Sequence, residues 1–246
     1  MEGEDGMVQL KLPISKFIER SFAVGAALWL SACAATVPTL EFRRNVYRIE
    51  TIAIVTPAVP EKPMLVSGAG VTPLVFFGAI GGFLDMKVQD HFASEYLAEL
   101  NSKGFSIGSL LSRDVAASLK TNGYTVVEAP VVRGEDEFLH NYPQSVNRAD
   151  YAYLDLVVTD YGYLAGAITA PYHPILSLKF RLVRSSDGAT LTQGSFVYSA
   201  FGSGVPPDSA YDFSNHGEIL SDLDRSMKGL SAGTTLASAA VANALK

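Results

Sequence analysis

Tyr151-Ala-Tyr-Leu-Asp-Leu-Val-Val-Thr-Asp-Tyr-Gly-Tyr-Leu164 is the longest stretch of the chain with the character of a β-strand. Aromatic and β-branched residues favour a strand, and apolar side chains at every second position fill one face. That face holds Ala152, Leu154, Leu156 and Val158. The stretch therefore predicts a long strand that opens the C-terminal half of the fold.

Two further strands follow the long one. Residues 175–183 alternate large apolar side chains with Ser177, Lys179 and Arg181, and residues 190–201 return after the turn signal Ser185-Ser186-Asp187-Gly188. This pattern predicts three consecutive antiparallel strands. Upstream, residues 46–56 predict a strand that ends as a continuous apolar run, and residues 124–128 predict a short strand.

Helical periodicity appears in three regions. Residues 85–103 end at Gly104, residues 109–122 begin at the expected cap Ser109 and stop at Gly123, and residues 211–245 supply one or two more helices. The elements together predict an α+β fold, a mostly antiparallel sheet of about four to five strands with helices packed on one face. The apolar stripes of the first two helices are Leu84, Val88, Phe92, Tyr96 and Leu100, then Leu111, Val115 and Leu119.

The second face of the long strand carries four tyrosines at alternating positions. They are Tyr151, Tyr153, Tyr161 and Tyr163. A tyrosine combines a flat apolar ring with a polar hydroxyl, which suits a protein or glycan contact surface as well as a sheet face covered by helices. Both interpretations stay open, and in the first the four tyrosines are candidate interaction residues.

Residues 63–84 contain no charged residue and hold five glycines. Those glycines and Pro73 argue against a stable single membrane span, because both weaken a helix. Three interpretations stay open: a Gly-rich loop packed on the domain, a surface used in self-association or pressed into the bilayer, and a transmembrane element. Phe76 and Phe77 are the candidate contact residues of this segment.

The N-terminal region has the pattern of a secretory signal peptide. Residues 21–30 form an uncharged apolar run, and Lys11, Lys16 and Arg20 precede it. The run is about half as long as a membrane-spanning helix. Residues 1–6 carry acidic side chains that do not suit the positive start of such a signal, so we expect translation to begin at Met7.

Leu30-Ser31-Ala32-Cys33 follows the apolar run and resembles the lipobox of bacterial lipoproteins. The resemblance implies cleavage between Ala32 and Cys33, a diacylglyceryl group on the Cys33 sulfur, and an acyl group such as palmitate on the new amine. Two or more such chains give a stable membrane anchor. An ordinary signal peptide with a chance cysteine is the alternative.

The lipobox resemblance also implies a location and a domain plan. Ala34 stands where an Asp tends to retain lipoproteins in the inner membrane, so we expect the outer membrane, with the protein facing the periplasm. Residues 1–32 are then the signal peptide, residues 33–45 the lipid-anchored linker, and residues 46–246 a single α+β domain.

Charge and composition exclude several classes of site. The net charge of −6 argues against a nucleic-acid groove. Cys33 is the only cysteine, so its lipidation leaves no thiol for a disulfide or a cysteine metal site. The four histidines, His91, His140, His173 and His216, show no metal-binding spacing. We expect no metal, and no cofactor beyond the acyl groups on Cys33.

Gly104-Phe105-Ser106-Ile107-Gly108 matches the pattern G-x-S-x-G. A hydrolase needs this pattern at a sharp turn from a strand into a helix, whereas here a predicted helix precedes it. A serine hydrolase using Ser106 is therefore a remote alternative, and we expect no enzymatic activity.

The order of the predicted elements resembles periplasmic lipoproteins whose core is shared with the N-terminal domain of TolB and with the curli secretion lipoprotein CsgG. Residues 52–57, 111–127, 149–163 and 180–183, with Asp187-Gly188, carry the resemblance. It implies a non-catalytic domain that contacts other envelope proteins at the outer membrane, as an assembly or scaffolding component and in some members as a ring of identical copies. The alternative is an oligomeric subunit of an export channel, with residues 63–84 against the membrane or the neighbouring subunit.

Overall fold

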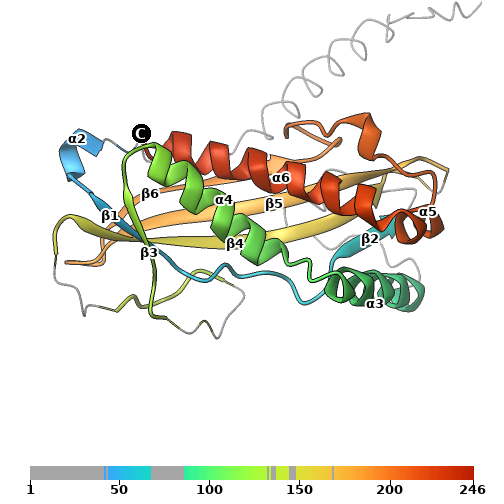
Figure 1. Ribbon diagram of the computed structural model, residues 1–246, viewed down its shortest axis with the longest axis horizontal. Coiled ribbons are helices and arrows are strands. Elements are labelled where there is room, and N and C mark those ends of the chain that lie inside the picture. Colours follow the sequence, from blue (N-terminus) through green and yellow to red (C-terminus); the bar gives the residue numbers. More distant parts are fainter. Residues whose placement is uncertain are drawn as a thin grey trace, which may run out of the picture. The chain divides into compact units, whose positions relative to one another are not determined.

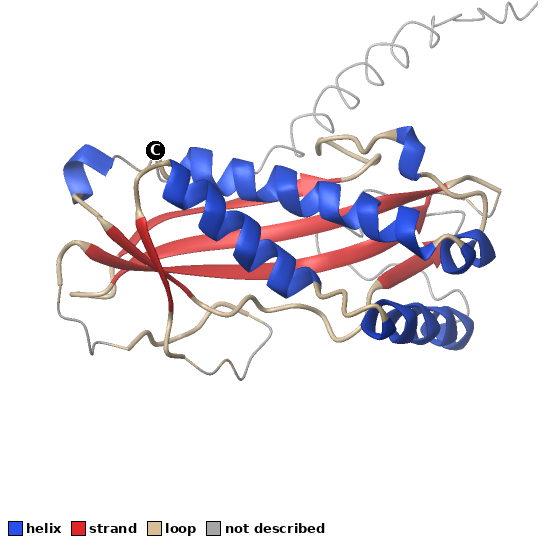
Figure 2. Ribbon diagram, viewed as in Figure 1, coloured by secondary structure: helices blue, strands red, loops and turns tan. Residues whose placement is uncertain are grey.

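The computed structural model describes residues 42, 44–67, 86–131, 133, 137–143, 148–167 and 169–246. Figures 1 and 2 show a sheet with helices laid across it. In chain order the elements are α2 (Arg44–Tyr47), β1 (Thr51–Ile54), β2 (Met64–Ser67), α3 (Met86–Ser102), α4 (Ile107–Thr121), β3 (Thr125–Glu128), β4 (Tyr151–Ala165), β5 (Tyr172–Arg184), β6 (Thr190–Tyr198), the 3-10 turn η2 (Ser209–Tyr211), α5 (His216–Ser221) and α6 (Leu223–Ala244).

The predicted α+β class is confirmed, with a sheet of six strands rather than four or five. The strand order is β3-β1-β4-β5-β6, and β2 also pairs with β4. The long ladders β4–β5 and β5–β6 are antiparallel, whereas β1–β3, β1–β4 and β2–β4 are short and parallel. Most of the paired residues are therefore antiparallel, as predicted, and the parallel strands lie on one side of β4.

Strands β1 and β2 follow one another along the same edge of β4. Thr51 pairs with Tyr151 at the start of β4, and Ser67 pairs with Ala165 at its end. The predicted strand 46–56 is shorter than expected, since residues 44–47 form α2. Within the Gly-rich segment 63–84, residues 64–67 form β2, which none of the three interpretations expected, and residues 68–84 lie outside the described part of the chain.

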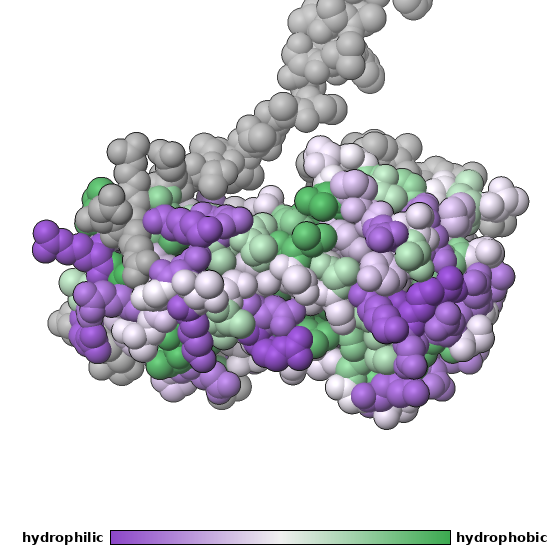
Figure 3. All heavy atoms as spheres, turned by 45° about the horizontal axis from the view of Figure 1, so that its top comes forward, coloured by the Kyte–Doolittle hydropathy of each residue, from purple (hydrophilic) through white to green (hydrophobic). Residues whose placement is uncertain are grey.

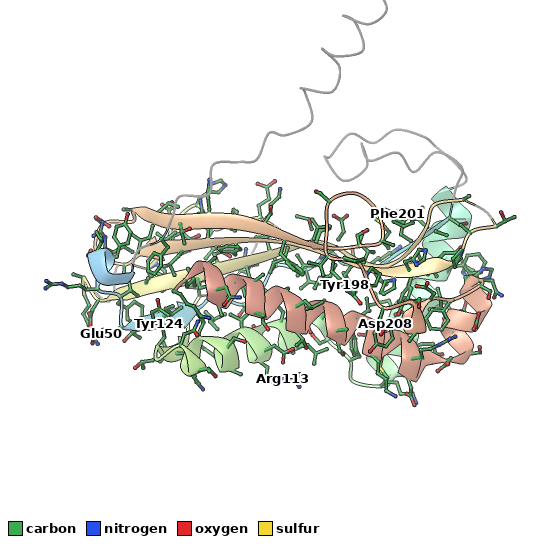
Figure 4. All side chains as sticks on the ribbon, turned by 90° about the horizontal axis from the view of Figure 1, so that it is seen from above. Glu50, Arg113, Tyr124, Tyr198, Phe201 and Asp208 are labelled. Atoms are coloured by element: carbon green, nitrogen blue, oxygen red, sulfur yellow. The ribbon has the colours of Figure 1, made fainter. Side chains whose placement is uncertain are left out.

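Helices α4 and α6 cover one face of the sheet, which we call the helix face (Figure 4). The predicted α4 stripe is confirmed, because Leu111, Val115 and Leu119 are fully buried in the main core. Helix α6 approaches the sheet closely at Gly229, where an added Cβ would lie 2.5 Å from the hydroxyl oxygen of Tyr163. On the side that carries the helices, hydrophilic and hydrophobic residues are intermixed (Figure 3).

Helix α3 packs beside β2 and buries Ala93, Tyr96 and Leu100. Tyr96 and Leu100 were expected on its apolar stripe, and Phe92 is partly buried against the same core. Leu84 and the side chain of Val88 lie outside the described part of the structure. The Tyr96 hydroxyl lies 2.6 Å from the Ser226 hydroxyl, which joins α3 to α6.

The opposite face of the sheet, which we call the outer face, has a smaller core of its own. Ala53, Val55, Tyr151 and Tyr153 form it, with Leu139 and Tyr142 packed on top. The covering residues belong to the irregular segment between β3 and β4. This segment brings polar side chains onto the sheet and forms the candidate site.

Candidate functional site

Two groups of predicted site residues lie outside the described part of the chain. They are Ala32 and Cys33 at the lipobox, and Phe76 and Phe77 in the Gly-rich segment. Lipidation and the aromatic contact therefore stay predictions. Among the described residues, no helix is both long enough and apolar enough to cross a membrane.

Of the two interpretations of the four tyrosines, the structure favours a covered sheet over an exposed contact surface, because the four rings are buried, and they lie on both faces of the sheet. A β-bulge between Val158 and Asp160 shifts the alternation of β4 by one residue. Tyr161 and Tyr163 therefore point into the main core on the helix face, while Tyr151 and Tyr153 stay in the outer-face core. None of the four is more than 8% exposed.

Two of these tyrosines, Tyr153 and Tyr163, donate hydrogen bonds from their hydroxyl groups to backbone carbonyl oxygens. The Tyr153 hydroxyl donates to the carbonyl oxygen of Pro143 over 2.8 Å, and the Tyr163 hydroxyl donates to that of Ser226 over 3.0 Å. Burial raises the pKa of Tyr161 to about 12, so this phenol stays neutral at physiological pH. The tyrosines thus stabilise the two cores and do not form a surface.

A buried carboxylate, Asp155, organises the outer face. It lies in the middle of β4 and has no solvent exposure. Its Oδ1 accepts a hydrogen bond from Arg133 Nη2, and its Oδ2 accepts bonds from the Leu139 amide at 2.9 Å and the Tyr142 hydroxyl at 2.8 Å. A buried charge is tolerated only when it is paired and hydrogen-bonded in this way. Asp155 therefore fastens the segment between β3 and β4 onto the sheet.

Two neighbours complete this network. Arg133 Nε also donates to the carbonyl oxygen of Thr56 over 2.8 Å, which ties the segment to the chain after β1. Burial, followed by the hydrogen bond to Asp155, raises the pKa of Tyr142 well above its ordinary value. The Tyr142 phenol is therefore a fixed donor to the carboxylate at physiological pH.

Arg181 of β5 borders the same network. Its Nη2 donates to the Leu139 carbonyl oxygen at 2.7 Å and to the Tyr142 hydroxyl at 2.8 Å. The guanidinium carbon lies 4.6 Å from the ring centre of Phe138, within the range of a cation–π contact. Beside it a cavity of about 160 Å³ opens toward the β5–β6 hairpin. It is lined by His140, Asn141, Tyr142, Arg181, Val183, Arg184, Ser185, Gly188 and Thr190.

Strand β6 forms one edge of the sheet and carries no charge. No charged residue or proline occurs from Gly188 to Val205. The Val205 amide donates to the Val197 carbonyl oxygen, and the Ser199 amide donates to the Val205 carbonyl oxygen. Because Val205 lies on the side of β6 away from β5, the backbone groups of the odd-numbered residues Val197 and Ser199 point away from β5. By the same alternation the amide and carbonyl groups of Gln193 and Ser195 point outward. Within the described part of the chain, no segment pairs with the outer side of residues 193–195.

Ser106 and His173, two polar residues considered in the sequence, each have a partner within the fold. Ser106 is the N-cap of α4 and its hydroxyl oxygen accepts from the Ser109 amide at 3.3 Å, so the cap lies three residues before the expected one, Ser109. Helix α3 precedes Ser106, which differs from the strand-to-helix turn that the hydrolase alternative requires. His173 Nδ1 lies 2.7 Å from Asp212 Oδ1. No group of three metal-ligating side chains occurs among the residues that the structure describes.

No protein-family model matches the chain, and no curated protein matches it in sequence. Solved structures similar to it include the PelC dodecamer from Paraburkholderia phytofirmans, with 16% identity over 80% of this chain and 88% of that chain and a TM-score of 0.34. Protein XCC0632 from Xanthomonas campestris, of family DUF330, is 13% identical over 80% and 85%, with a TM-score of 0.37. Lipoprotein GNA1162 from Neisseria meningitidis is 21% identical over 60% and 81%, with a TM-score of 0.30. These values assign the chain to no family.

Proposed function

We propose that the chain is an outer-membrane lipoprotein that acts without catalysis as an assembly or scaffolding component. Acyl groups on Cys33 anchor it, the domain faces the periplasm, and protein contact is its activity. The observation that supports contact most directly is the unprotected edge at β6.

Sheets usually protect an edge strand with lysine, proline or a covering element, since exposed backbone groups pair with other chains. No lysine or proline occurs from Gly188 to Val205, and among the described residues only Val205 pairs with the outer side of β6, at Tyr198. The opposite edge strand, β3, has four residues and ends at Glu128. Addition of a strand from another envelope protein or a second copy at Gln193–Ser195 is the contact that this arrangement favours.

Replacing Ser195 with proline tests this contact. The Ser195 amide points outward, so its loss should spare the β5–β6 ladder and remove the hydrogen bond to a partner strand. A photo-crosslinking residue at Gln193 should give discrete adducts in cells, and Ser195→Pro should abolish them. Ser195→Ala is the matched control, because it removes the hydroxyl and keeps the amide.

The control measurement for this pair of variants is thermal unfolding, which should change little in either. A crosslinker at the exposed Thr235 of α6 should give no such adducts, because it lies on another face. Adducts at Gln193 that persist in a folded Ser195→Pro variant would contradict strand addition at β6.

The anchor has its own test. Cys33→Ala should abolish labelling of the protein by radioactive palmitate and release it into the periplasm, because the acylated thiol and the processing site are both lost. Ser31→Ala, which keeps a small residue before the cysteine, should leave labelling intact. Labelling that continues in Cys33→Ala would refute the lipobox interpretation.

A further inference from the structure

Arg181 lacks an anionic partner among the residues that the structure describes. Asp155 is directly opposite Arg181 in the β4–β5 register, yet its two carboxylate oxygens accept their hydrogen bonds from Arg133, Leu139 and Tyr142. No carboxylate of the described part lies within 4.0 Å of the Arg181 guanidinium, and its buried Nε has no hydrogen-bond partner there. A partly buried charge in this condition is costly unless something neutralises it.

The cavity beside Arg181 offers room for such a group. It has a volume of about 160 Å³, and its walls include the hydroxyl-bearing residues Ser185 and Thr190. Arg184, the second arginine of the wall, is already balanced, because its Nε lies 3.0 Å from Asp187 Oδ1. Among the described residues of the wall, Arg181 is therefore a positive charge without an ion pair, and the exposed Thr190 hydroxyl lies on the same wall.

We infer that this cavity binds a phosphate group. A charge-assisted hydrogen bond from a guanidinium to a phosphate oxygen is stronger than a neutral hydrogen bond. The phosphate can belong to a soluble molecule or to a lipid headgroup. Only the second source rests on the proposed lipid anchor.

The position of the cavity in the fold suits a headgroup. The Ser185 amide donates to the Tyr151 carbonyl oxygen over 3.0 Å, and Tyr151 pairs with Thr51, so the hairpin lies at the end of the sheet where β1 begins. Figure 4 shows Glu50 at this end and Phe201 toward the other. Phe42, nine residues after Cys33, is packed against Tyr47 just before β1.

Titration of the full chain with inorganic phosphate, against chloride at equal ionic strength, tests the site. We expect saturable binding by calorimetry and a shift of the Arg181 Nε resonance in nitrogen NMR. Arg181→Gln should weaken the affinity by about tenfold or more. Lys179→Gln should not, because Lys179 is exposed two residues earlier on the same face of β5. Absence of saturable binding to the unchanged chain would overturn the inference.

A second variant keeps the test valid if Arg181→Gln fails to fold. Thr190→Glu leaves Arg181 in place and adds a carboxylate at the cavity wall, where Thr190 is exposed. This carboxylate should compete with phosphate and weaken its binding in a folded protein. Unchanged affinity in Thr190→Glu would place any bound phosphate elsewhere and refute the site.

Vesicle flotation distinguishes the two sources. The Cys33→Ala chain, which has no anchor, is mixed with vesicles of phosphatidylcholine that do or do not contain phosphatidic acid. Arg181-dependent flotation with phosphatidic acid, displaced by inorganic phosphate, supports the headgroup. Phosphate binding without flotation supports a soluble ligand. Palmitate labelling of the unchanged chain tests the anchor separately, so failure of the cavity and failure of the anchor give different results.

Discussion

Replacing Asp155 with asparagine should lower the free energy of unfolding by about 3–5 kcal/mol. The change leaves Arg133, whose side chain is 8% exposed, as a buried charge without its partner. It also places an amide NH2 where an oxygen now accepts, facing donors from Arg133, Leu139 or Tyr142. Urea unfolding followed by far-UV circular dichroism measures the loss.

The matched control is Asp150→Asn, one residue before β4. Asp150 is also paired with an arginine, but that partner, Arg148, is 56% exposed, so water solvates whatever the substitution leaves unpaired. We expect only a small change in stability. A loss in Asp155→Asn no larger than that in Asp150→Asn would show that the buried network does not hold the outer face together.

A double variant separates loss of a pair from loss of packing. Asp155→Leu combined with Arg133→Met removes both charges and fills the space with apolar atoms. It should recover much of the stability lost in Asp155→Asn, because no unpaired charge stays buried.

The strands of the C-terminal half could be predicted because alternation and the turn Ser185–Gly188 specify them locally. β4, β5 and β6 appear close to their expected limits. The face of each β4 residue beyond Val158 could not be predicted, because apolar residues occupy both parities there. One bulge residue decides which set meets the helices, and the pattern contains no signal for it.

The candidate site was missed for a different reason. Asp155 and Arg181 are visible in the sequence as charges on otherwise apolar strands, and that was the available signal. Their partners Arg133, Leu139 and Tyr142 belong to an irregular segment that has no periodicity to place it. Strand β2 was missed because four residues beside a Gly-rich run give too short a pattern.

Replacing Gly162 with alanine should lower the free energy of unfolding by about 3 kcal/mol or more. Gly162 has φ of +133°, a conformation that other residues rarely adopt, and an added Cβ would lie 2.0 Å from the Met64 carbonyl oxygen of β2. Strain of this kind costs about 1–3 kcal/mol, and the overlap with backbone atoms adds a similar amount. Urea unfolding again measures the effect.

Gly188→Ala is the control that separates strain from overlap. Gly188 has φ of +70° in the β5–β6 turn, and its added Cβ would meet no atom within 4 Å. The expected loss of stability is therefore only the cost of holding alanine in the left-handed conformation, about 1–2 kcal/mol. An equal loss in the two variants would mean that β2 does not pack on β4 as described. Hydrogen exchange locates the difference. If the amides of Leu65 and Val66 exchange faster in Gly162→Ala while those of β5 do not, β2 docks on a sheet that is complete without it.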